Sequence, residues 1–191
     1  MKTHLFFLVL AVAALVVAGW NVTPNQYTFA SGSRVWVEGT STIHDWSCQA
    51  GQINGNVTAE PVTDRLTAIS GVTVTIPISS MDCGNGTMNG KLRDALAAAP
   101  NISFSLSSAQ VGSVNNGLFA IRASGSLSIA GVTRTMNISA TGRALSNGRF
   151  RITGSVPFAM SRFGVDPPTA MLGTIRTRDD VIVGFDVTVQ P

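Results

Sequence analysis

The residues best suited to chemistry lie together in the stretch G-T-S-T-I-H-D-W-S-C, from Gly39 to Cys48. The chain has two histidines, and this stretch holds His44, the one outside the apolar N-terminal run, beside Trp46. A histidine can act as a general base, form hydrogen bonds or bind a metal ion. A rare polar group beside an aromatic ring, in a chain rich in apolar residues, is the first candidate for ligand contact.

The neighbours of His44 do not support a catalytic site. His44 and Asp45 are adjacent, so on an extended chain their side chains point to opposite faces and cannot pair. The sequence contains no G-x-S-x-G motif for a serine nucleophile and no glycine-rich loop for a phosphate. One histidine and two cysteines do not provide a metal site. We therefore expect no enzymatic activity, no catalytic residue, no cofactor and no metal.

Residues 1–19 are typical of a secretory signal peptide. Lys2 precedes an apolar run, and small residues at the end of that run favour cleavage after Ala18 or Gly19. The run is shorter than the roughly 20 residues that a spanning helix needs, although an uncleaved anchor is an alternative. We expect one domain over residues 20–191, located in the periplasm or secreted, with no stable membrane span after cleavage.

Cys48 and Cys83 are the two cysteines of the chain. An even number of cysteines in an oxidising compartment favours a disulfide bond between them. Closing a loop of this length would stabilise the fold by about 3–4 kcal/mol in the chain-entropy estimate. The alternative is two buried thiols.

Alternation of apolar and polar residues dominates the remainder of the chain and indicates β-strands. In the segments around residues 102–106, 119–123, 136–140, 150–160 and 181–189, the apolar residues share one face and Ser, Thr or Arg occupies the other. Asn-Gly and Ala-Gly pairs at 116–117, 130–131 and 147–148 fit hairpin turns. This pattern predicts an all-β protein, either a sandwich or a closed antiparallel barrel of about eight strands.

Two segments depart from the alternation. Met88, Leu92, Leu96 and the alanines near them form one helical stripe, with Thr87 as the expected N-cap and Pro100 as the stop. We expect this helix near the barrel mouth, either as a plug or as a gate for a ligand. Residues 161–173 contain two prolines and predict a loop or lid, in which Phe163 and Met171 either face a pocket or hold the loop down.

A barrel of this size can hold one small ligand in an apolar interior. An apolar tail would bind inside, and a charged head group would lie at the mouth near His44, Trp46, Arg93 and Arg134. The alternatives are surface arginines, a structural histidine and a core tryptophan. The candidate lining residues are apolar: Leu92, Leu96, Phe104, Phe158, Met160 and Phe163.

The order of several short motifs resembles the bacterial YceI-like family. The motifs are G-T-S-T-I-H-D-W at 39–46, M-N-G-K-L-R-D-A-L at 88–96, P-N-I-S-F at 100–104, G-S-L-S-I-A-G-V-T-R at 125–134, F-G-V-D-P-P-T at 163–169 and D-D-V-I-V-G-F-D-V at 179–187. The resemblance implies a lipocalin-like barrel with an apolar tunnel for a polyisoprenoid or another long-chain lipid. The histidine motif of the family falls on His44, and its helix motif falls on residues 91–96.

The sequence thus predicts an exported protein whose partner is an amphiphilic lipid. Two other functions stay open, namely a cell-envelope interaction module with a packed barrel, and an enzyme that acts on a lipid head group through His44. Charged residues make up 12% of the chain, and its net charge of +3 does not gather in one basic patch. We therefore expect no nucleic-acid partner. The sequence sets no oligomeric state, and a homodimer stays open.

Overall fold

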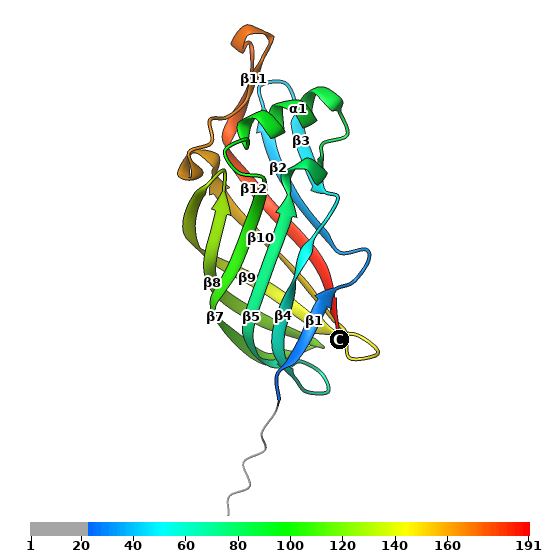
Figure 1. Ribbon diagram of the computed structural model, residues 1–191. Coiled ribbons are helices and arrows are strands. Elements are labelled where there is room, and N and C mark those ends of the chain that lie inside the picture. Colours follow the sequence, from blue (N-terminus) through cyan, green and yellow to red (C-terminus); the bar gives the residue numbers. More distant parts are fainter. Residues whose placement is uncertain (1–22) are drawn as a thin grey trace, which may run out of the picture.

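The structure, a computed structural model, describes residues 23–191, so the predicted signal peptide lies outside the described residues. Its strands form an antiparallel sheet that closes into a barrel (Figure 1). The closed ring consists of β1 (Asn25–Phe29), β4 (Asn54–Pro61), β5 (Leu66–Pro77), β7 (Asn101–Asn115), β8 (Leu118–Ile129), β9 (Val132–Ala144), β10 (Phe150–Ala159) and β12 (Ile175–Gln190). The predicted antiparallel barrel of about eight strands is confirmed.

Three further strands extend the wall at one end of the barrel. They are β2 (Arg34–Ser41), β3 (Asp45–Ala50) and β6 (Met81–Asp82). The long strand β12 pairs with β1 near its C-terminus and with β2 along most of its length. β1 therefore closes the ring of strands between β4 and β12, and β2, β3 and β6 continue the sheet from the other part of β12.

The predicted hairpin turns connect β7 to β8, β8 to β9 and β9 to β10. Asn116 and Gly117 have φ of 51° and 75°, and Ala130 and Gly131 have 48° and 79°. Consecutive left-handed residues match the twist of antiparallel strands, which is why an Asn-Gly pair is favoured there. These turns fix the strand register that places Phe119, Ile121 and the other alternating apolar residues inside the barrel.

Aromatic side chains fill the end of the barrel opposite the helix. The ring centroid of Phe150 lies 6.0 Å from that of Tyr27 and 6.4 Å from that of Phe119, both in edge-to-face geometry. All three residues are at most 2% exposed. A second apolar cluster surrounds Phe158 and Phe163 at the helix end. Because the rings of Tyr27, Phe119 and Phe150 pack together at the far end, an opening to the interior is expected at the helix end.

The predicted helix is present as α1 (Gly86–Ala95), but the expected N-cap is wrong. Asn85 caps the helix, because its side-chain oxygen accepts hydrogen bonds from the backbone N–H groups of Thr87 and Met88, at 2.9 and 3.2 Å. Thr87 lies inside the first turn, where its own N–H needs that acceptor. The helix ends at Ala95, ahead of Pro100.

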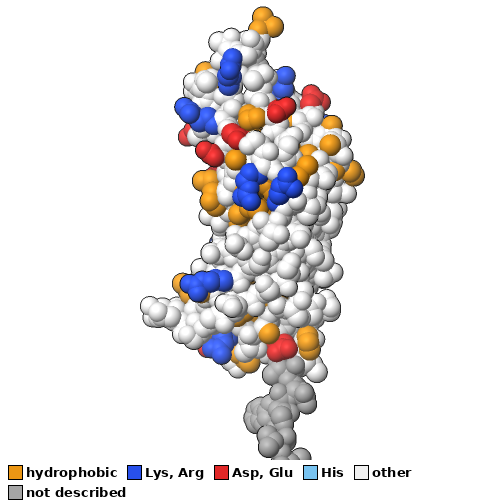
Figure 2. Space-filling view, turned by 90° about the vertical axis from the view of Figure 1, so that its left-hand side faces the viewer, with side chains coloured by type: hydrophobic (Ala, Val, Ile, Leu, Met, Phe, Trp, Pro, Cys, Tyr) orange, Lys and Arg blue, Asp and Glu red, His pale blue; other side chains and the backbone are white. Residues whose placement is uncertain are grey.

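The segment after β10 is irregular, as predicted. It contains the turn η2 (Met160–Phe163), the two-residue strand β11 (Thr169–Ala170) and the turn η3 (Met171–Gly173), while η1 (Ile78–Ser80) joins β5 to β6. β11 and the start of β12 form a hairpin that projects beyond the barrel (Figure 1) and carries apolar side chains at its tip (Figure 2). Met171 was expected in a pocket or against the barrel, but it is 73% exposed. Among residues 23–191, no helix is long and apolar enough to span a membrane.

Candidate ligand-binding cavity

The inward faces of the strands surround a cavity of about 320 Å³. Every side chain that lines it belongs to an apolar residue type, and the lining runs from Phe29 and Val189 near one end to Leu92 and Pro168 near the other. This volume lies within the roughly 300–1,000 Å³ typical of small-molecule sites. The cavity can hold an apolar chain, but its walls offer no charged group to a polar head.

Six of the predicted site residues line this cavity. They are Leu92, Leu96, Phe104, Phe158, Met160 and Phe163. Small residues of the ring strands, among them Ala109, Ala123 and Ala140, also line it and leave the space that larger side chains would fill. Sequence reasoning did not select these alanines, although the alternation placed Ala123 and Ala140 on an inward face.

Helix α1 closes one end of the cavity with Leu92, Ala95 and Leu96. The predicted disulfide between Cys48 of β3 and Cys83 is present, with the two Cα atoms 3.9 Å apart. It ties the segment just before the helix to the barrel wall. The start of the helix is therefore held in place covalently.

Asn89 adds a second attachment between the helix and the strand β6. Its side-chain oxygen accepts the backbone N–H of Cys83 at 2.7 Å, and its amide donates to Asp82 at 2.9 Å. The hydrogen bond from Asn89, with one from the N–H of Gly84, holds the pKa of Asp82 below its ordinary value. These contacts support a helix that is fixed at its N-terminal end.

The turn η2 covers a stretch where two ring strands separate. β10 pairs with β9 only from Phe150 to Gly154, and beyond that point η2 lies beside β9. Phe163, which is fully buried, packs edge to face on Phe158 with ring centroids 5.1 Å apart. η2 thus completes the wall at the helix end.

Asp179 of β12 anchors η2 to the neighbouring strand. Its carboxylate accepts the hydroxyl of Ser161 at 2.5 Å and the backbone N–H of Ser161 at 2.8 Å. The hydrogen bond from the Ser161 hydroxyl, followed by that from the N–H, keeps the pKa of Asp179 below its ordinary value. The carboxylate therefore stays charged and bonded at neutral pH.

His44 and Trp46 do not line the cavity. His44 lies in the exposed turn between β2 and β3, and its Nδ1 is 2.8 Å from the backbone oxygen of Asp45. His44 therefore lies outside the strands, and the alternative of a buried structural histidine is wrong. Trp46 is half-buried over Gly39, where an added Cβ would collide with its ring, and its Nε1 donates to the oxygen of Thr40 at 3.3 Å. This geometry supports the alternative of a packing residue.

The two candidate arginines lie outside the cavity lining. Arg93 is exposed on α1. Arg134 is exposed as well, but its position on β9 pairs with Leu127, which lines the cavity. Its Nε donates to the backbone oxygen of Arg162 in η2 at 3.1 Å. Arg134 therefore lies at the helix end of the wall, while the geometry gives Arg93 no link to the interior.

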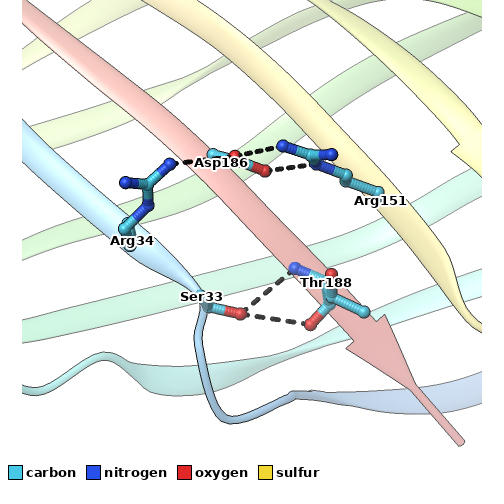
Figure 3. Close-up of polar contacts among 5 residues, drawn as sticks. All are labelled: Ser33, Arg34, Arg151, Asp186 and Thr188. Atoms are coloured by element: carbon cyan, nitrogen blue, oxygen red, sulfur yellow. Dashed lines mark hydrogen bonds and ion pairs between the residues drawn. The ribbon is translucent and has the colours of Figure 1, made fainter.

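The ion pairs among the described residues lie on the outer surface (Figure 3). Asp186 of β12 contacts Arg151 at 2.5 Å and Arg34 at 3.3 Å. The hydrogen bond from Arg151 lowers the pKa of Asp186, and the same bond raises the pKa of Arg151. This cluster joins β2, β12 and β10 and is separate from the cavity. In the part of the chain from 23 to 191, no three His, Cys, Asp or Glu side chains come together as metal ligands.

The family model described as a YceI-like domain matches residues 20–190. The chain belongs to the YceI-like family. In this chain the YceI-like domain is a barrel with an apolar interior and a helix at one end. No curated protein sequence matches it.

Solved structures share the fold of this YceI-like chain at low sequence identity. BcnA of Burkholderia cenocepacia is 18% identical with a TM-score of 0.64, and the alignment covers 82% of this chain and 95% of BcnA. A polyisoprenoid binding domain from Saccharophagus degradans is 15% identical with a TM-score of 0.65, covering 86% of this chain and 97% of that domain. The YceI protein of Campylobacter jejuni is 18% identical with a TM-score of 0.58, covering 74% and 82%. These likenesses establish the fold.

Proposed function

We propose that this protein is an exported carrier that holds the apolar chain of an amphiphilic lipid, of the polyisoprenoid class, inside its barrel. The observation that carries the proposal is the cavity of about 320 Å³ with a lining of apolar residues only. Burial of each CH₂ group in such a site contributes about 0.8 kcal/mol before the cost of ordering the chain. The polyisoprenoid class draws on the similarity to the Saccharophagus degradans domain.

The volume sets a scale for the bound chain. A cavity of about 150 Å³ holds one benzene ring. A cavity of about 320 Å³ then accommodates about a dozen carbon atoms, or two to three isoprene units, without moving a side chain. A longer chain would have to displace side chains at the helix end, such as Leu92 and Phe163, or emerge between them.

The polar head group has its best position beside Arg134. This arginine is exposed at the helix end of β9, and only one of its contacts reaches another segment, the backbone oxygen of Arg162. A guanidinium group suits a phosphate because it can donate two parallel hydrogen bonds. His44 is a weaker candidate for the head group, because it does not line the cavity and its ring nitrogen contacts the backbone oxygen of Asp45.

The other functions have less support. A packed barrel would not contain a cavity of this size. An enzyme based on His44 would need a partner side chain from another strand, whereas the ring nitrogen contacts a backbone oxygen. We therefore propose binding without catalysis.

A matched pair of β8 variants tests the proposal. Ala123 lines the cavity, whereas Ala120 lies on the same strand with an exposed, outward-facing side chain. Titration of the delipidated protein with farnesyl pyrophosphate should show at least tenfold weaker binding for Ala123→Phe, and unchanged binding for Ala120→Phe. Equal binding by the two variants would contradict a site inside the barrel.

A second pair of variants tests where the head group binds. Arg134→Gln should weaken binding of farnesyl pyrophosphate about tenfold and leave binding of farnesol unchanged, because hydrogen bonds to charged groups contribute about 1.5–3 kcal/mol. Arg122→Gln, on the outer face of β8, is the control and should change neither. If Arg134→Gln weakens both ligands equally, the arginine supports the fold and does not contact the head group.

A further inference from the structure

The projecting tip of the molecule carries the most exposed large apolar side chains of the described residues. Met171 is 73% exposed and Leu172 is fully exposed in the turn η3. Ile43, in the turn between β2 and β3, is 60% exposed. Thr42 links the β2–β3 turn to the base of the projecting hairpin, because its backbone N–H donates to the oxygen of Arg176 at 3.0 Å and its hydroxyl donates to the oxygen of Thr174 at 3.4 Å. Met171 and Leu172 form what we call the apolar tip, and Ile43 lies in the neighbouring β2–β3 turn.

The backbone of the apolar tip holds these side chains in an unfavourable conformation. Met171 and Leu172 have φ of 52° and 54°, in the left-handed region that bulky residues rarely adopt. Both the backbone N–H and the hydroxyl of Thr174 donate to the oxygen of Met171, at 3.1 and 2.7 Å, and lock the turn. Glycine would form such a turn without strain. Strain of this kind is concentrated at functional sites, so the tip is a candidate contact surface.

Basic residues lie directly behind the apolar tip. Arg176 and Arg178 are exposed near the start of β12, and the guanidinium of Arg176 donates to the oxygen of Gly173 at 2.8 Å. The acidic Asp179 and Asp180 follow farther along the strand, and Asp179 is engaged by Ser161. In Figure 2, Lys and Arg side chains lie beneath the tip, with acidic side chains close below and beside them.

We propose that the apolar tip docks on the surface of a lipid bilayer that contains anionic phospholipids. Apolar side chains would enter the boundary between head groups and acyl chains, and the arginines would contact the anionic head groups. Pro168, next to β11, lines the cavity, so docking would place the helix end of the cavity close to the membrane. Docking would allow the bound ligand to exchange with the bilayer. This consequence rests on the function proposed above.

A bilayer fits this surface better than a protein partner does. A stable protein interface buries about 800 Å² on each partner, usually around a broad packed centre. Two side chains at the end of a narrow projection cannot supply such an area. They can, however, enter the outer ~5–10 Å of a bilayer, as amphipathic surface anchors do.

Sedimentation with vesicles tests the proposal. The purified protein should bind vesicles of phosphatidylcholine mixed with phosphatidylglycerol, and bind phosphatidylcholine alone more weakly. Met171→Ser combined with Leu172→Ser should reduce binding at least tenfold, since the variant loses both apolar side chains that would leave water for the bilayer. Arg176→Gln and Arg178→Gln should each reduce binding to the mixed vesicles about fivefold.

Exposed apolar residues at the opposite end provide the control. Val62, in the β4–β5 connection, is 39% exposed, and Leu118, the first residue of β8, is 44% exposed. Val62→Ser combined with Leu118→Ser should leave vesicle binding unchanged. All variants should keep the circular dichroism spectrum of the wild type, because every altered side chain is exposed.

Three results would overturn the proposal. They are absence of vesicle binding by the wild type, equal binding by the tip variant, and a tip-dependent dimer in sedimentation velocity that excludes vesicles. The vesicles contain no isoprenoid, so a failure of docking leaves the result of the Ala123 experiment unaffected. Conversely, loss of cavity binding with intact docking would refute the carrier function alone.

Discussion

The rings of Phe158 and Phe163 meet edge to face, with their centroids 5.1 Å apart and their planes inclined by 68°. Phe158 belongs to β10 and Phe163 to η2, so this contact joins the turn to the strand that it leaves. Both rings line the cavity. The same contact therefore completes the wall and shapes the interior at the helix end.

Replacement of Phe163 by alanine should lower the free energy of unfolding by about 3–5 kcal/mol, because the ring is fully buried. Urea denaturation followed by circular dichroism measures this loss. Leu118→Ala, at an exposed turn, should change stability by less than about 0.5 kcal/mol. If Phe163→Ala is as stable as the control, the ring does not hold η2 against the barrel.

The disulfide should contribute about 3–4 kcal/mol, since it closes a loop with a sequence separation of 35. The double variant Cys48→Ala, Cys83→Ala should lose this amount and become insensitive to reductant. Reduction of the wild type should have a comparable effect. Two reactive thiols in the unreduced wild type would contradict the bridge.

The sequence predicted those features of the fold that depend on neighbouring residues. Alternation placed Phe104 and Ile121 on inward faces because side chains alternate along any strand. Asn116–Gly117 marked a turn because the backbone there needs φ above zero. The stripe of Leu92 and Leu96 marked the helix and the face that it buries.

Features that depend on distant segments were not predictable in the same way. His44 lies in a turn because β2 and β3 pair with each other up to Thr40 and Asp45, a register that spacing alone does not give. Asn85, and not Thr87, is the N-cap because the helix begins one residue before Thr87. The volume of the cavity depends on how the residues of all ring strands meet, which no local pattern specifies.

Close packing between β7 and β8 explains why position 125 of the barrel is a glycine. A Cβ atom on Gly125 would lie 2.5 Å from the backbone oxygen of Ser105 and 2.6 Å from Cε2 of Phe104. Gly125→Ala should therefore destabilise the protein by about 1–3 kcal/mol through overpacking. At Gly112 the nearest atom would be 3.6 Å away, so Gly112→Ala is the matched control. Thermal unfolding measures both, and equal melting temperatures would contradict the close packing at Gly125.

The lowered pKa of Asp179 predicts acid sensitivity. Because the folded pKa lies below the ordinary value of about 3.9, the stabilisation is complete above that value and is lost as pH falls through the folded pKa. Asp179→Asn should show a smaller decline in unfolding free energy below about pH 4 than the wild type. Asp180→Asn, on the next and exposed position, is the control. The same decline in all three proteins would contradict the anchoring role of Asp179.

The central claim is that the barrel holds an apolar chain, and native mass spectrometry of protein purified from its natural host tests it most directly. We expect an added mass that organic solvent removes and that lipid analysis identifies as an amphiphile with an apolar chain. Ala123→Phe prepared in the same way should lack the added mass, and Ala120→Phe should retain it. Wild-type protein at its bare mass, with no extractable lipid, would contradict the account.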